Sequence, residues 1–345
     1  MKKIYIIKFK KIFMPSLFMI FTICLILFSK SNLAAAKTGL LLFANSIVPS
    51  LFPFFVATEL LSHTNIVHIL GKIFSPLMKP LFHIRGEGSF PFIMGFLSGY
   101  PMGAKIAVQF RNEKICSKEE CERLLSFTNN SGPLFIIGTV GISLLGNYNL
   151  GVLLFFSHVI ASITVGIIFR YWKYNNKTTS ILKSKKDISF SIKKSDLKIN
   201  NLGEVIGTSI MNSISTIMLI GGFVVLFSVI ISILQSSKIL YYIAFVIKNI
   251  FSYYNLPINL ISSFITGLFE ITNGINSLSA FSTSYFYTTI ALISFVLGFG
   301  GISVLLQIWS VISKSDLSIK PYFYGKLLQG FLSSIYTLLF LVYFL

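Results

Sequence analysis

The chain has 345 residues, of which 54% are hydrophobic and only 12% are charged. Soluble domains carry about 25% charged residues, so this composition excludes a water-soluble globular protein and indicates an all-α polytopic membrane protein. The net charge of +18 would suggest nucleic-acid binding in a soluble protein. Here the basic residues lie between apolar runs, as in cytoplasmic loops, and we expect no nucleic-acid partner.

The N-terminal segment is basic, MKKIYIIKFKK, and the apolar run 12–28 follows it. This pattern is similar to that of a signal peptide, and the later sequence NLAAAK resembles a cleavage site. The run is nevertheless about as long as a short transmembrane helix, and further spans follow. We therefore expect residues 1–38 to form an uncleaved transmembrane helix and a linker, with a cytoplasmic N-terminus.

Seven apolar runs are long enough to cross a bilayer of about 30 Å as helices. They are 12–28, 39–62, 124–146, 150–172, 204–234, 287–312 and 322–345. Two further apolar segments, 89–110 and 257–280, carry helix-breaking residues at their centres. The shorter segments 66–82 and 238–251 are amphipathic, which favours a position along the membrane interface.

The segment 89–110 contains the sequence GFLSGYPMGAK, with Gly and Pro at its centre and Lys105 beside them. A turn at membrane depth leaves backbone groups that lipid cannot satisfy. The N-terminus and the basic loop 173–203 are expected to be cytoplasmic. Counting crossings from both of these points places the two flanks of 89–110 in the cytoplasm. A single crossing is therefore excluded, and we predict a re-entrant hairpin.

The second half of the chain repeats motifs of the first half in the same order, at offsets all close to 170 residues. The pairs are NSI at 45–47 and 212–214, GFLSGYPMGAK at 95–105 and GLFEITNGINS at 267–277, and NNSGPLFI at 129–136 and GFGGISVL at 298–305. By the crossing count, span 39–62 and span 204–234 run in opposite directions. We therefore predict two inverted repeats, 39–172 and 204–345, with 257–280 as the second re-entrant hairpin.

In transporters built from inverted repeats, the substrate binds near the middle of the membrane at broken helices. The turn of the first hairpin offers Ser98, Gly99, Tyr100 and Gly103 as candidate substrate-binding residues. Lys105 follows them and could neutralise an anionic substrate. Its long side chain could equally reach the cytoplasmic interface.

The second hairpin contributes Glu270 and Asn273 to the candidate site. An ionisable residue in a membrane segment is a functional candidate by default. We expect Glu270 to bind a coupling proton or cation and Asn273 to contact the substrate. The alternative is a structural role for Glu270, as the partner of Lys105 or of a backbone amide.

The sequence TNNSGP opens the span 124–146 with a cluster of polar side chains. A helix cap needs only one such residue, whereas this cluster offers Asn129, Asn130 and Ser131. Gly and Pro follow at once and favour unwinding of the helix. We therefore predict that these three residues also bind the substrate.

No enzymatic constellation is found in the sequence. Cys116 and Cys121 lack the neighbouring ligands that a metal site needs, and His63 and His68 are not spaced to share one helical face. The chain has no phosphate-binding loop for ATP. We expect no enzyme activity, no cofactor and no metal.

At NSIVPSLFPFFV, GFLSGYPMGAK, LLSFTNNSGPLFIIGTVG and GLFEITNGI, the chain resembles the YlbJ family of sporulation integral membrane proteins. That family carries nucleoside recognition or gate domains and is distantly similar to concentrative nucleoside transporters. The resemblance covers about residues 40–340. It implies a role in endospore formation, with dipicolinic acid moving across the outer forespore membrane.

Lys105 beside the first hairpin turn suits a small dianion such as dipicolinate better than an uncharged nucleoside. The expected partners are therefore a small anionic substrate and the lipid bilayer. Two other functions stay open, a nucleoside-type permease and a non-transporting scaffold for assembly of the spore envelope. A homo-oligomer or other sporulation membrane partners are also possible.

Overall fold

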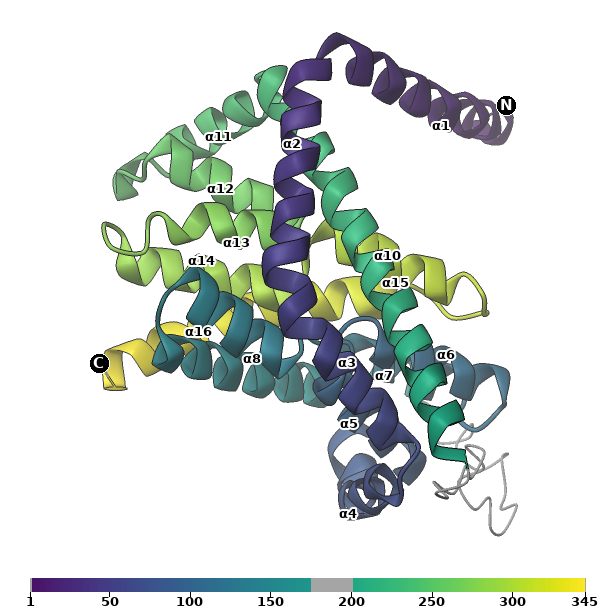
Figure 1. The fold of residues 1–345 in the computed structure, drawn as a ribbon. Coiled ribbons are helices and arrows are strands. Elements are labelled where there is room, and N and C mark those ends of the chain that lie inside the picture. The colour runs from purple at the N-terminus through teal and green to yellow at the C-terminus, as the bar shows by residue number, and fades with distance from the viewer. Residues whose placement is uncertain (1, 175–200, 345) are drawn as a thin grey trace.

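The computed structural model describes residues 2–174 and 201–344, and all regular elements within them are helices (Figure 1). The predicted all-α class is therefore confirmed. The predicted basic loop 173–203 lies mostly outside the described residues. The helices of the first half are α1 (Lys2–Leu27), α2 (Ser29–Leu42), η1 (Phe43–Ile47), α3 (Val48–Ser62), α4 (Asn65–Phe82), η2 (Gly86–Gly88), α5 (Ser89–Leu97), α6 (Met102–Asn112), α7 (Lys118–Phe127), η3 (Leu134–Leu144) and α8 (Tyr148–Phe169). Those of the second half are α10 (Leu202–Ser236), α11 (Ile239–Ile250), η5 (Ser252–Tyr254), α12 (Ile258–Phe269), α13 (Ile271–Ser279), α14 (Phe286–Phe299), α15 (Gly301–Ile312) and α16 (Lys320–Phe344).

Five helical stretches in the described part of the chain are long and apolar enough to cross a membrane, against seven predicted spans. They are Ser29–Leu61, Tyr148–Phe169, Leu202–Ser236, Phe286–Ile312 and Lys320–Tyr343. The predicted span 12–28 corresponds to the shorter apolar helix Ile12–Leu27. The linker expected before residue 39 is helical, because α2 begins at Ser29.

The predicted span 124–146 is not one helix, because α7 ends at Phe127 and helical structure resumes at Leu134 in η3. The side chain of Asn130 turns back and donates from Nδ2 to the carbonyl oxygen of Phe127 at 2.7 Å. Pro133 has no N–H to continue a helical ladder. The polar sequence thus ends α7 and leaves a non-helical segment, 128–133, inside the protein.

Two helical rods form one wall of the molecule, which we call the α3/α10 wall and define as α2, η1, α3 and α10. The 35-residue helix α10 packs along α2 and α3 (Figure 1). Small residues permit this approach, since Gly221 of α10 lies against the ring of Phe43. Many apolar side chains of α1, α2 and α10 are exposed, as expected for surfaces that face lipid.

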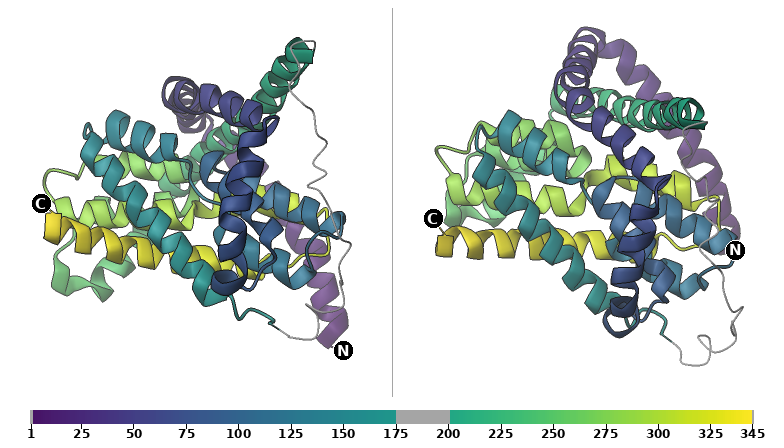
Figure 2. Two further views of the ribbon diagram at one scale, coloured as in Figure 1. Left: turned by 90° about the horizontal axis from the view of Figure 1, so that it is seen from below. Right: turned by 60° about the horizontal axis from the view of Figure 1, so that its bottom comes forward.

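Apart from α1, which packs against α2, the remaining helices form a second body beside this wall, as the two views of Figure 2 show. Within this body, helix α16 packs against α7, α8 and α14. Buried hydroxyls join α14 to α16, with Ser294 Oγ 2.7 Å from both Ser333 Oγ and Thr337 Oγ1.

Both predicted hairpins are helix–turn–helix units in this second body. Helices α5 and α6 pack on each other, as do α12 and α13. The turns fall at Ser98–Pro101 and at Glu270, within the glycine-containing motifs. Positive φ values of 85° at Gly300 and 77° at Gly301 separate α14 from α15, so the predicted span 287–312 also has a break.

Candidate functional site

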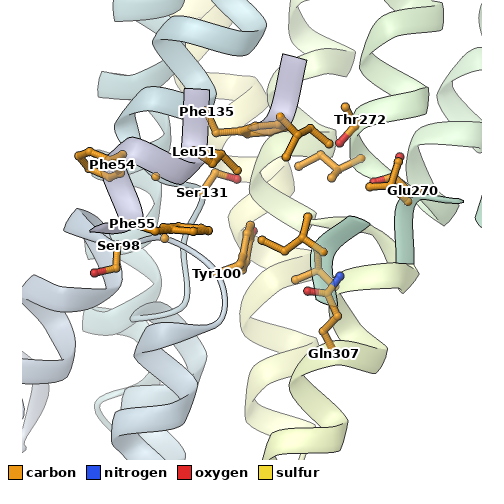
Figure 3. A pocket seen from close by; sticks show the side chains of 17 residues that line it. Leu51, Phe54, Phe55, Ser98, Tyr100, Ser131, Phe135, Glu270, Thr272 and Gln307 are labelled. Carbon is orange, nitrogen blue, oxygen red and sulfur yellow. The ribbon is translucent and has the colours of Figure 1, made fainter. Parts of the chain in front are cut away.

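A cavity of about 50 Å³ lies where the two hairpin turns, the break after α7 and the α3/α10 wall meet (Figure 3). The wall lines it with apolar side chains only, namely Ile47, Leu51, Phe54, Phe55, Ile220 and Val224. Segments far apart in the sequence therefore converge on one small space.

The polar side chains of the cavity all come from the second body. They are Ser98 and Tyr100 of the first hairpin, Ser131 of the break, Glu270 and Thr272 of the second hairpin, and Gln307 of α15. Tyr100 stands between Phe55 and Gln307 in Figure 3. The arrangement suits a small ligand with both an aromatic or apolar face and polar groups.

Five of the ten predicted site residues line this cavity. They are Ser98, Gly99, Tyr100, Ser131 and Glu270. The other five, which do not line it, are Gly103, Lys105, Asn129, Asn130 and Asn273. The structure thus brings the three predicted motifs together, but it places half of the named residues behind the cavity surface.

Gly103 has a packing position instead of a cavity position. A Cβ atom added at Gly103 would collide with the backbone carbonyl of Thr128, and the same holds for Gly95 on the other arm of the hairpin. Both arms therefore close on the end of α7, where any larger residue would separate them. Lys105, two residues further along α6, is exposed.

Glu270 is buried and caps helix α13. Its Oε2 accepts a hydrogen bond from the backbone N–H of Asn273 at 2.7 Å. No ion pair joins Glu270 to Lys105 in the described parts of the chain, so the pairing considered from the sequence is absent. Asn273 itself points to the α3/α10 wall, where its Nδ2 donates to Ser228 Oγ at 2.9 Å.

Asn129 and Asn130 contact helix α16 and α8 behind the cavity. Asn129 Nδ2 lies 3.5 Å from the hydroxyl of Tyr322. Asn130 Nδ2 donates to Ser162 Oγ at 3.1 Å, and its Oδ1 accepts from Gln329 Nε2 at 2.9 Å. These amides connect the break after α7 to a polar cluster on α16.

Lys326 is the central residue of that cluster and was not predicted from the sequence. Its side chain is only 1% exposed, its Nζ donates to Gln329 Oε1 at 2.7 Å, and Nζ lies 5.4 Å from the ring centroid of Tyr100. A signal was present, since Lys326 and Gln329 lie three residues apart inside the predicted span 322–345. An ionisable residue within a predicted span is a functional candidate on the same grounds as Glu270.

Several buried polar atoms around the cavity have no hydrogen-bond partner in the structure. They are Ser98 Oγ, the Tyr100 hydroxyl, Asn129 Oδ1 and Ser131 Oγ. Buried polar groups are nearly always paired in native proteins. Three of these atoms belong to residues that line the cavity, Ser98, Tyr100 and Ser131, and such a group is typical of a place where a ligand or ordered water binds.

Comparison with known proteins gives the family. The Gate family, described as nucleoside recognition, matches residues 44–169 and 217–315. The sporulation integral membrane protein YlbJ of Bacillus subtilis (strain 168) is 35% identical over 341 residues, which cover 96% of this chain and 83% of that protein. No solved structure matches the chain. The chain therefore belongs to the YlbJ family of sporulation integral membrane proteins and carries the Gate nucleoside recognition domain.

Proposed function

We propose that this chain is a secondary transporter of a small organic anion and that its binding site is the cavity between the hairpin turns. The observation that carries the proposal is the meeting of two hairpin turns and a broken helix at one cavity, lined by polar groups on one side. Broken helices at the centre of a membrane protein are the usual place of substrate sites in secondary transporters. The Gate domain supports the same class.

Dipicolinic acid is the substrate that we propose, moving across the outer forespore membrane. The similarity to a sporulation integral membrane protein supports a role in sporulation. A compact aromatic dianion also suits the lining, because Phe54 and Phe55 offer apolar faces while Ser98 and Ser131 offer hydroxyls. The two halves, 39–172 and 204–345, would act as inverted repeats around this site, with the N-terminus in the cytoplasm.

The proposed roles of the predicted residues follow their positions. Ser98, Tyr100 and Ser131 would contact the substrate directly, because they line the cavity. Glu270 would hold a coupling proton or cation, since it is a buried carboxylate at the cavity surface. Gly103, Asn129, Asn130 and Asn273 would position these groups, and exposed Lys105 would attract anions from a distance.

Two other functions are possible for the same structure. A nucleoside-type permease would use the same polar groups for a neutral substrate, and the description of the Gate family favours this alternative. A non-transporting scaffold for assembly of the spore envelope would require no unpaired polar groups beside a cavity. The scaffold therefore accounts less well for the hydroxyls of Ser98 and Ser131.

Uptake of dipicolinate by vesicles that contain the purified protein tests the proposal. Gly132 lines the cavity, and a Cβ there would make only ordinary contacts at 3.7 Å or more. The larger side chain of Gly132→Leu should fill the cavity and abolish uptake. Gly207→Leu is the matched control, because a Cβ at Gly207 meets nothing within 4 Å.

Dipicolinate uptake by the wild type and by Gly207→Leu, but not by Gly132→Leu, is the expected result. Uptake of uridine in place of dipicolinate would favour the permease. Equal uptake by all three proteins would contradict the assignment of the cavity, and no uptake of either solute by the wild type would contradict transport.

A further inference from the structure

Lys326 lies in the middle of the protein without a negatively charged partner. It is 1% exposed, and among the residues that the structure describes no carboxylate forms an ion pair with it. Glu270 is the acidic residue that lines the nearby cavity, and it caps α13. Transfer of an ammonium group from water to such a place costs free energy unless a counter-charge accompanies it.

The orientation of Lys326 is fixed by a chain of hydrogen bonds. The carbonyl oxygen of Phe127 can only accept, so Asn130 must present its Nδ2 to it and its Oδ1 to Gln329. Gln329 then donates from Nε2 to that Oδ1 and presents its Oε1 to Lys326 Nζ. Each of the two amides therefore has one possible orientation in this series of hydrogen bonds. Gln329 Oε1, the last acceptor in the series, holds the Lys326 ammonium group in place.

Tyr100 connects this ammonium group to the cavity. Its ring lies 5.4 Å from Lys326 Nζ, and the same residue lines the cavity from the first hairpin turn. The Tyr100 hydroxyl is buried and lies near Ser131 Oγ, a group of the cavity lining, and neither has a hydrogen bond to any other group in the described part of the chain. Both hydroxyls can donate to a carboxylate. Two residues with hydroxyl donors therefore line the cavity, and the Lys326 cation lies beside the ring of one of them, outside the cavity lining.

We propose that Lys326 is the counter-charge for a carboxylate group of the transported anion, in place of Lys105. The carboxylate accepts hydrogen bonds from the hydroxyls of Tyr100 and Ser131 and lies close to the Lys326 ammonium, with the Tyr100 ring displaced from its present position. This inference rests on the proposed function, because it assumes an anionic substrate. The inference adds Lys326 to the proposed site as the residue that selects for a negatively charged substrate.

The test is binding of dipicolinate to the purified full-length protein, measured by titration calorimetry. Lys326→Met should weaken binding by about tenfold or more, as expected for the loss of one charge-assisted contact. Lys326→Arg keeps the charge and should bind within about threefold of the wild type. Lys320→Met is the matched control, since Lys320 begins the same helix and is exposed.

A second ligand separates charge recognition from general damage to the site. The uncharged diamide of the same pyridine ring should bind the wild type and Lys326→Met equally, because it has no charge for Lys326 to offset. Melting temperatures of all variants, measured without ligand, report on folding. Lys326→Met should melt no lower than Lys320→Met, because it removes a buried charge that lacks a partner.

Each result has a defined meaning. Unchanged dipicolinate affinity in Lys326→Met would overturn the inference and leave the proposed function in place. Loss of binding in both Lys326→Met and Lys326→Arg, with a lowered melting temperature in both, would show a structural role and also overturn it. Absence of dipicolinate binding to the wild type would contradict the proposed function itself.

Discussion

Trp172 donates a hydrogen bond from its indole N–H to Glu122 Oε2 at 2.9 Å, which joins the segment after α8 to α7. The same oxygen forms an ion pair with Lys173 Nζ at 3.0 Å. The other carboxylate oxygen accepts from the backbone N–H of Ser318 at 3.2 Å, just before α16. One buried carboxylate thus fastens three segments of the second body at the end where we expect the cytoplasm.

Glu122→Ala should destabilise the protein by about 1–3 kcal/mol, because it leaves buried donors without an acceptor. The melting temperature of the purified protein in detergent measures this loss. Glu119→Ala, on the same helix and partly exposed, is the control and should change stability far less. Equal melting of both variants would mean that the Glu122 contacts add no stability.

Glu270 allows its two roles, capping and ion coupling, to be separated. Glu270→Gln keeps an oxygen that accepts from the Asn273 N–H but removes the charge. It should impair ion-coupled uptake while the amount of protein in the membrane stays normal. Glu270→Ala also removes the cap, which costs about 1 kcal/mol. Normal uptake by Glu270→Gln would leave Glu270 with a structural role only.

Lys105 is exposed, so it should act on anions only through its long-range field. Lys105→Ala should raise the KM for dipicolinate by less than about threefold at low salt. The effect should disappear at high ionic strength, where exposed charges are screened beyond about 3 Å. Uptake measured at two salt concentrations checks this. A large rise in KM at both would place Lys105 in direct contact with the substrate.

Arg111 of α6 holds Asp316 by two hydrogen bonds of 2.8 Å, from Nε and from one terminal nitrogen. This contact lowers the pKa of Asp316 from its usual value to about 2. The folded-state pKa is depressed, so the stabilisation is complete above the unfolded pKa of about 4 and is lost as the pH falls through about 2. Because both side chains are partly exposed, it should amount to less than about 1 kcal/mol.

Asp316→Asn tests this contact. Its melting temperature should lie slightly below that of the wild type at pH 7, and the two should converge as the pH approaches 2. A difference that stays constant down to that pH would exclude the charge of Asp316 as the cause.

The prediction that the first hairpin is re-entrant determines on which side of the membrane its two flanks should lie. Cysteines introduced at Glu87 and at Asn112, in a background without the native cysteines, should both react with a membrane-impermeant reagent from the cytoplasmic side. The positions lie just before α5 and at the end of α6. Labelling from opposite sides would contradict the re-entrant hairpin and the inverted repeat together.

The two helix–turn–helix units and the break after α7 could be predicted from the sequence, because residues close together in the chain determine them. Gly99 adopts a positive φ of 70° and Pro101 has no backbone N–H, so the two residues favour the turn between α5 and α6, and Asn130 caps α7 from three residues away. The position of Lys326 was not predictable in the same way. A Lys near the start of a predicted span can extend to the interface, and only the packing of α16 against α7 and α8 buries it.

The exposure of Lys105 and the burial of Gly103 were likewise not predictable from the sequence. Both lie in one motif, yet α6 presents Gly103 to the carbonyl of Thr128 and leaves Lys105 exposed. Which face of a short helix is covered depends on a neighbour distant in the sequence. The motifs therefore predicted where the site lies, but not which of their residues line the cavity.

The α3/α10 wall contributes no polar side chain to the cavity, whereas the opposite body contributes all six. A substrate held by the hydroxyls of that body would consequently form its hydrogen bonds on one side of the cavity and only apolar contacts on the other. Apolar contact has no preferred direction, so the wall offers the substrate no directional hydrogen bond from a side chain. Hydrogen bonds such as Ser50 to Thr139 and Asn273 to Ser228 join the two parts away from the cavity. If these hydrogen bonds broke, the second body could move relative to the apolar wall while the substrate stayed bound to that body.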